Sequence, residues 1–299
     1  MLLAELEGDG LDMVAANDAR RCSFTVTAGA RLLTVAGDDL SIVHEWTLGA
    51  EPRGTHASLP DRRLALVSGA DRVTLLEAGG TARWSLPHMP WAGNRESGCT
   101  WFDAAGRPFA VIPSPGDGGC LIVHLDAATG RPVAHAAIAA SPAGIEPIHQ
   151  ANGWVALSEG EGQDATRAWW VRAVDDAGRF RLEVLDAGWD DAVLMDADRT
   201  GDRVLVGPHV AGPLTVRSFP DLRVLREVSP PDPEEAWDFT ACFVREHLVA
   251  RLLDGVARTV AVDRRGRVEE LDVGPGWLVP AWDSWLTVER TRLRRWTLV

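Results

Sequence analysis

The chain has no lysine and no tyrosine, so all 30 of its basic side chains are arginine. The 43 acidic residues outnumber them, and the formal net charge is -13. A negatively charged surface repels a phosphate backbone, so nucleic acid is not an expected partner. The abundance of alanine, arginine, glycine and aspartate, without lysine or tyrosine, also indicates a bacterial genome rich in G and C.

Long apolar runs and paired cysteine motifs are missing as well. No uninterrupted apolar segment approaches the ~18 residues that a membrane-spanning helix needs. Glu5 and Glu7 stand where a secretory signal would be apolar. We therefore expect a cytoplasmic protein without membrane contact. The cysteines lack zinc-site spacing, so we predict buried thiols, no metal and no cofactor; they are Cys22, Cys99, Cys120 and Cys242.

What recurs along the chain is a turn signal in which glycine follows aspartate by two to four residues. Aspartate accepts hydrogen bonds from the backbone ahead of it and glycine adopts positive φ, so this pair between two apolar runs predicts a hairpin. The flanking runs are short and β-branched or aromatic, without a long helical pattern. The signal reads DAAGRP (103–108), DAATGRP (126–132), DDAGRF (175–180), DRTGDR (198–203) and DRRGRV (263–268).

The hairpins that end successive units recur every roughly 43 to 50 residues, the length of a four-stranded propeller blade. They are marked by Gly80, Gly130, Gly178, the turn at 220–221 and Gly266. The sequence therefore predicts an all-β fold, a single β-propeller domain over residues 1–299 with seven blades of four antiparallel strands. The expected blades are 23–49, 54–87, 98–138, 145–186, 191–228, 237–272 and 275–299.

The last expected blade has only three visible strands. Residues 1–8 can supply the fourth, and the pairing would remove an exposed sheet edge. The first unit is also short, so six blades with an irregular closure is the alternative.

Two stretches carry a family resemblance. In its repeat length and in DDLSIVHEWTL (38–48) and DRVTLLEAGGTARWSL (71–86), the chain resembles WD40-like propellers. LDAATGRPVA (125–134) resembles the turn of quinoprotein propellers, in which Asp-x-x-Thr-Gly precedes a docking tryptophan. Here His135 and Ala136 stand near the place of that tryptophan, so the resemblance does not extend to binding of the quinone cofactor PQQ. It implies a propeller that binds other proteins.

Candidate binding residues lie in the loops between blades, because function collects on loops that a rigid scaffold holds. Aromatic residues there offer contact area at little cost in side-chain entropy, which suits a protein or peptide partner. The alternative is that each tryptophan is a buried wedge between neighbouring blades. The predicted partner-binding residues are Trp91, Arg95, Trp189, Asp190, Trp237, Asp238 and Trp277.

The predicted function is thus that of a non-enzymatic protein-binding platform. One alternative is a propeller hydrolase or lactonase with a metal or an acid and histidine site in the central channel. His56, Glu146, His149 and Asp196 fall near the expected inner strands and could converge there. A sensor that holds a small ligand in the channel is a third possibility. The acidic loop 158–167 is expected to be solvated, because its glycines leave the carboxylates unorganised.

Overall fold

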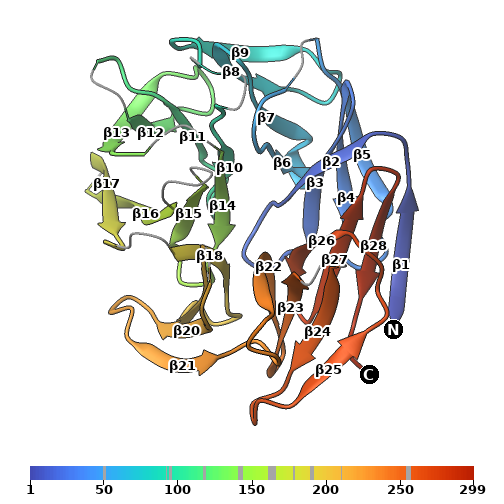
Figure 1. Ribbon diagram of the computed structural model, residues 1–299. Helices are drawn as coiled ribbons and strands as arrows, with labels where there is room; N and C mark the ends of the chain where they lie inside the picture. The colour runs from blue at the N-terminus through green and yellow to red at the C-terminus, as the bar shows by residue number, and fades with distance from the viewer. Residues whose placement is uncertain are drawn as a thin grey trace.

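The computed structural model describes residues 1–49, 52–91, 93, 96–116, 119–140, 144–160, 166–177, 179–188, 192–209, 211–253 and 257–299. These residues form seven four-stranded antiparallel sheets, which follow one another around a central axis (Figure 1). The predicted all-β propeller with seven blades is therefore confirmed, and the six-blade alternative is wrong. The helical turn in this part of the chain is η1 (Pro60–Arg62).

The first three blades take their strands in chain order, from the innermost outward. Blade 1 holds β2 (Leu11–Ala16), β3 (Ser23–Ala28), β4 (Arg31–Ala36) and β5 (Ile42–Thr47). Blade 2 holds β6 (Ala57–Leu59), β7 (Leu64–Ser68), β8 (Arg72–Leu76) and β9 (Ala82–Pro87). Blade 3 holds β10 (Thr100–Phe102), β11 (Pro108–Pro113), β12 (Cys120–Leu125) and β13 (Pro132–Ile138).

The next three blades repeat this order. Blade 4 holds β14 (Ile145–His149), β15 (Val155–Gly160), β16 (Thr166–Asp176) and β17 (Arg179–Asp186). Blade 5 holds β18 (Ala192–Ala197), β19 (Arg203–Pro208), β20 (Leu214–Ser218) and β21 (Val224–Val228). Blade 6 holds β22 (Ala236–Val244), β23 (His247–Leu253), β24 (Arg258–Val262) and β25 (Val268–Leu271).

Blade 7 is built from both ends of the chain. It holds β26 (Trp277–Ala281), β27 (Ser284–Glu289), β28 (Arg292–Trp296) and, outermost, β1 (Leu2–Glu7). The N-terminal strand pairs antiparallel with β28, from Leu2 opposite Trp296 to Glu7 opposite Arg292. Figure 1 shows the two termini close together at this blade. The predicted closure by the N-terminal strand is confirmed, and it gives the outer edge of β28 a partner.

Blade 1 starts earlier in the chain than the expected unit 23–49. Its inner strand β2 begins at Leu11, so this blade has four strands like the others. The pairing of β2 with β3 shifts register between Leu11 and Val14. This irregularity interrupts the alternation of apolar and polar residues, and that alternation is the signal by which a strand is recognised in a sequence.

The hydrophobic core lies between the blades. The buried apolar residues of the described chain fall into seven clusters, and each cluster joins two consecutive blades, including blade 7 to blade 1. In the cluster between blades 2 and 3, for example, Leu66 and Leu75 pack with Phe102 and Val123. Burial of apolar area between neighbouring sheets is therefore what holds the ring together.

Two tryptophans on outer strands dock onto the hairpin of the next blade. The indole N–H of Trp46 on β5 donates to the carbonyl of Glu77 at 3.0 Å, and that of Trp84 on β9 donates to Ala127 at 3.1 Å. A Cβ added at Gly130, in the hairpin between β12 and β13, would lie 2.6 Å from Cδ2 of Trp84. The DAATGRP stretch therefore forms the surface against which Trp84 of the preceding blade packs.

In other Asp-Gly turns, the aspartate side chain binds the backbone of its own hairpin. Asp103 accepts from the backbone N–H of Arg107 at 2.9 Å, and its carboxylate also binds the Arg107 guanidinium. The same arrangement joins Asp263 to Arg267, with a guanidinium contact of 3.0 Å. An aspartate that satisfies backbone donors in this way stabilises a hairpin irrespective of any ligand. Gly178, in the third of these turns, lies outside the described residues.

We predict that Gly130→Ala destabilises the protein more than Gly266→Ala. Both glycines have positive φ in equivalent hairpins, but an added methyl at Gly266 meets no atom within 4 Å. Gly266→Ala should lower the free energy of unfolding by about 1 kcal/mol, the backbone cost alone. Gly130→Ala should add about 1–3 kcal/mol for the clash with Trp84. Urea denaturation measures both, and equal losses would show that Trp84 docking does not depend on the glycine.

Candidate functional site

A cavity of about 400 Å³ occupies the centre of the ring. Its walls come from the inner strands β2, β14, β18, β22 and β26, which lie far apart in the sequence. Much of the wall is apolar, including Val14, Ile148, Leu194, Met195, Leu278 and Val279. A concave, mainly apolar cavity with a few convergent polar groups is the usual form of a ligand site.

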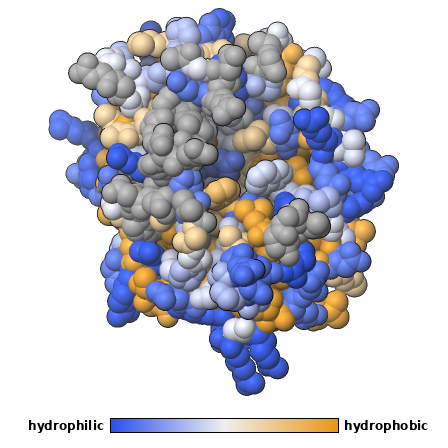
Figure 2. Space-filling view, in the orientation of Figure 1, coloured by the Kyte–Doolittle hydropathy of each residue, from blue (hydrophilic) through white to orange (hydrophobic). Residues whose placement is uncertain are grey.

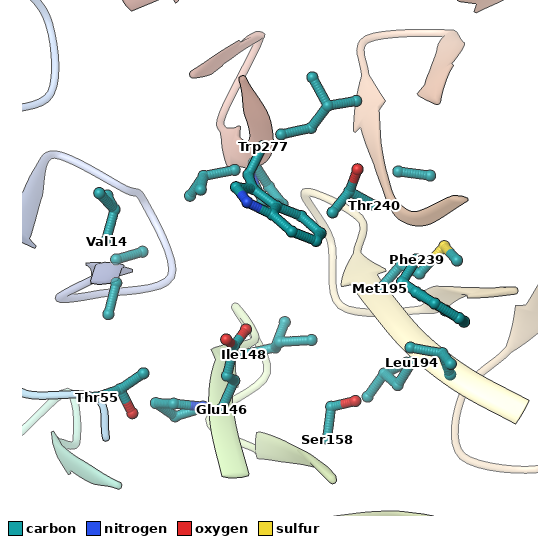
Figure 3. A pocket seen from close by; sticks show the side chains of 18 of the residues that line it. Val14, Thr55, Glu146, Ile148, Ser158, Leu194, Met195, Phe239, Thr240 and Trp277 are labelled. Atoms are coloured by element: carbon teal, nitrogen blue, oxygen red, sulfur yellow. The ribbon is translucent and has the colours of Figure 1, made fainter. Parts of the chain in front are cut away.

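Exposed aromatic side chains surround the mouth of the cavity, on the face that carries the loops between blades. Trp277, the first residue of β26, is 57 % exposed, and Phe239 on β22 is 43 % exposed. The His209 ring lies 5.8 Å from the Phe239 ring, centroid to centroid. In Figure 3 the indole of Trp277 extends over the cavity from one side and Phe239 lies on another. Apolar residues also gather near the middle of this face in Figure 2.

A buried arginine contacts Trp277 and the backbone next to it. The guanidinium of Arg251 on β23 lies 5.9 Å from the centroid of the Trp277 ring, and its Nη1 donates to the carbonyl of Gly276 at 2.8 Å. Asp238 pairs with the same guanidinium at 3.5 Å. Both charged side chains are largely buried. Asp238 and Arg251 therefore hold the backbone that presents the indole.

The predicted site residues separate into three groups. Trp277 is exposed at the cavity mouth, as expected of a binding residue. Trp91, Trp237 and Asp238 are only 6 %, 2 % and 7 % exposed, so in this structure they do not form the exposed surface that was expected of them. Arg95, Trp189 and Asp190 lie outside the described residues.

Trp237 is a wedge between blades, which was the alternative for these tryptophans. It packs in the cluster that joins blades 5 and 6, and its indole N–H donates to the carbonyl of Val228 at 3.0 Å. Trp91 packs in the cluster that joins blades 3 and 4. Large aromatic side chains bury more apolar area than other side chains do. Burying these tryptophans between blades therefore stabilises the propeller.

Phe239 and His209 were not predicted as site residues. The pairing of β22 with β23 shifts register between Trp237 and Ala241, so strict alternation does not say where Phe239 points. The sequence offered one usable signal, namely that Phe239 directly follows the Trp-Asp pair, in a segment that the sequence predicted to be a loop between blades.

An ion pair lies at the far end of the channel. Arg21, in the turn between β2 and β3, forms an ion pair with Asp196 on β18, which joins blade 1 to blade 5. Asp196 also accepts from the backbone N–H of Phe243 in blade 6 at 2.8 Å. Arg21 lines both the channel and a second cavity on the opposite face. The pair therefore separates the two cavities, and the channel opens at its aromatic end.

Of the four titratable residues expected to converge, Glu146 and His149 line the cavity. Asp196 is fully buried in the ion pair with Arg21, and His56 is buried beside the channel, where its Nδ1 accepts from the Ser68 N–H at 3.1 Å. Burial lowers the pKa of His56 to about 4, and burial together with the nearby Arg21 charge lowers that of His149 to about 4. Both rings are therefore neutral near pH 7.

Glu146 has a different environment. Its carboxylate is exposed to the channel, but the inner strands of the blades surround the channel, and the resulting desolvation raises the pKa of Glu146. Burial also raises the pKa of Asp196, against the opposing effect of Arg21. Within the described ranges, no three histidine, cysteine, aspartate or glutamate side chains are grouped as metal ligands. In the same residues, no helix is long and apolar enough to cross a membrane.

Comparisons with known proteins agree with this architecture. No family model matches the chain, and no curated protein sequence matches it. Among solved structures, the β-propeller domain of Cps50 (Swd1) from Myceliophteria thermophila superposes with a TM-score of 0.62 at 10% identity, covering 100% of this chain and 99% of that one. BamB from Moraxella catarrhalis superposes with a TM-score of 0.59 at 12% identity, covering 100% of this chain and 99% of that one.

These likenesses define a class of fold. The chain is a seven-bladed β-propeller with a mainly apolar central cavity, and its resemblance to WD40-like and quinoprotein-like propellers is confirmed at the level of fold. At such low identity the likeness extends to architecture alone, because one fold hosts many functions.

We predict that Arg21 and Asp196 are energetically coupled. Removing one member of a buried ion pair leaves an uncompensated charge, so Arg21→Met and Asp196→Asn should each cost about 3–5 kcal/mol of unfolding free energy. The double variant should cost less than the sum, by about 1–3 kcal/mol. Chemical denaturation of the four proteins measures this coupling, and additive costs would mean that the two side chains act independently.

The buried histidines predict a loss of stability in acid. In the unfolded chain histidine titrates near pH 6.5, so between pH 6.5 and about 4 the unfolded state binds protons that His56 and His149 in the folded state do not. The free energy of unfolding should therefore fall as the pH falls through this window. The raised pKa values of Glu146 and Asp196 act in the opposite direction, because those carboxyls take up protons in the folded state first.

His56→Asn isolates the histidine contribution, since its amide oxygen can replace the Nδ1 acceptor for the Ser68 N–H. The free energy of unfolding of the variant should change less steeply with pH than that of the wild type, by up to about 1.4 kcal/mol per pH unit. Urea denaturation at pH 7, 6 and 5 gives both slopes. Parallel slopes for the variant and the wild type would contradict the neutral, buried state of His56.

Proposed function

We propose that this protein is a non-enzymatic binding platform of a bacterial cytoplasm, whose partner is another protein or a peptide. The observation that supports this proposal is the exposure of Trp277 and Phe239 at the mouth of the apolar cavity. Large exposed aromatics beside a pocket are typical of the few residues that provide most of the affinity in protein interfaces.

Rigid support strengthens the case. Trp277 and Phe239 lie on inner strands that neighbouring blades hold in place, and Arg251 and Asp238 buttress the backbone next to Trp277. A partner that binds there orders few flexible groups, so little of the contact energy is lost to conformational entropy. The acidic charge of the chain, -13, favours a partner with a basic surface.

The hydrolase alternative has less support. A zinc hydrolase holds its ion with three protein ligands, and the part of the chain that the structure describes groups no such set. Glu146 and His149 do line the channel, but a neutral histidine with a pKa of about 4 is a weak base near neutral pH.

We predict that peptides selected on this protein depend on the aromatic mouth. A displayed library of random peptides would be selected on the full chain, and the enriched peptides measured by calorimetry on the variant with Trp277→Ala and Phe239→Ala. Loss of both anchors should weaken binding at least about 30-fold, the effect of removing a hot spot.

The matched control carries Ile42→Ala and Leu225→Ala. These side chains are also exposed, at 48 % and 46 %, but they lie on the outer strands β5 and β21. The control should bind the selected peptides like the wild type. If instead both double variants bind the peptides with wild-type affinity, the channel mouth is not the binding surface and the proposal fails.

A further inference from the structure

The central cavity contains a carboxylate to which the described part of the chain offers no partner. Glu146 is the second residue of β14, near the open end of the channel, and Figure 3 shows its carboxylate directed into the cavity. Among the described residues it forms no ion pair or hydrogen bond, and desolvation alone raises its pKa. The carboxylate is open to the channel, so a charged group that enters the channel can pair with it.

The other charges around the cavity leave it negative. Arg21, at the far end, is matched by Asp196, and His149 is neutral near pH 7. A ligand that complements this cavity therefore carries positive charge.

The shape of the site restricts the kind of cation. Ca²⁺ takes six to eight oxygen ligands and Mg²⁺ an octahedral set with water, whereas much of the cavity wall is apolar. An organic cation on an aliphatic stem fits better, because its methylene groups pack on apolar surface while its head group pairs with a carboxylate. Trp277 and Phe239 at the mouth favour such a cation further, since aromatic faces attract positive charge.

We propose that the channel accepts a lysine or arginine side chain of the bound partner, with the cationic head group paired to Glu146, the stem against Ile148 and Val279, and Trp277 over the entrance. This inference rests on the proposed function, since the side chain belongs to the peptide held at the aromatic mouth. The Arg21–Asp196 pair limits how deep the side chain reaches, because it separates the channel from the opposite face.

The test combines changes in the protein and in the peptide. Each lysine or arginine of a selected peptide is replaced by norleucine, which keeps an aliphatic stem without the charge. On the wild-type chain, one replacement should weaken binding at least 10-fold. The parent peptide should bind the Glu146→Gln variant at least 10-fold more weakly than it binds the wild type. On that variant, the norleucine replacement should have almost no further effect on the affinity.

A matched control is Glu227→Gln, which removes an exposed acid from the outer strand β21. It should respond to the peptide changes like the wild type. Glu146→Gln should fold with an unchanged or higher melting temperature, because it removes an unpaired charge from a desolvated place. If the norleucine replacements have the same effect on the wild type and on Glu146→Gln, the inference is overturned.

The outcomes separate this inference from the proposed function. Binding that depends on Trp277 and Phe239, but on neither Glu146 nor a basic peptide residue, overturns the inference and leaves the proposed function standing. In a second measurement, hexylammonium is titrated into the full chain and into Glu146→Gln by NMR. If this free amine binds through Glu146 while no peptide binds at the mouth, the site takes a small cation, and both the partner side chain and the proposed function are overturned.

Discussion

The structure depends on the burial of each blade between two others. A four-stranded sheet with two apolar faces cannot cover both of them alone, and here the seven hydrophobic clusters of the described chain each lie between consecutive blades. The arrangement is satisfied only when the ring closes. The pairing of β1 with β28 therefore matters to every blade, since it completes blade 7 and lets it pack against blades 6 and 1.

Ring closure also creates the candidate site. Because inner strands from different blades converge on one axis, residues as distant in sequence as Val14, Glu146 and Trp277 line one cavity. The same convergence brings Arg21 and Asp196 together from blades 1 and 5. The described part of the channel thus has a buried ion pair at one end and exposed aromatic side chains at the other.

Tryptophan shows how one residue type serves several purposes in this fold. Trp46 and Trp84 dock onto the hairpins of the following blades, Trp237 fills the space between two blades, and Trp277 stands exposed at the mouth. All four lie within strands. Their roles differ because of the strand on which each lies and the face to which local register turns it.

The sequence by itself determined the repeating part of this protein. Turn chemistry at DAAGRP and DAATGRP and the spacing of the hairpins were enough to predict seven blades, because hairpins depend on local residues. Only the tertiary structure decided the site. Bulges in β2 and β22 hide the direction of individual side chains, so neither the early start of blade 1 nor the exposure of Phe239 could be deduced. Whether Glu146 faces a partner or an empty cavity depends on what other blades place opposite it, and no local pattern contains that information.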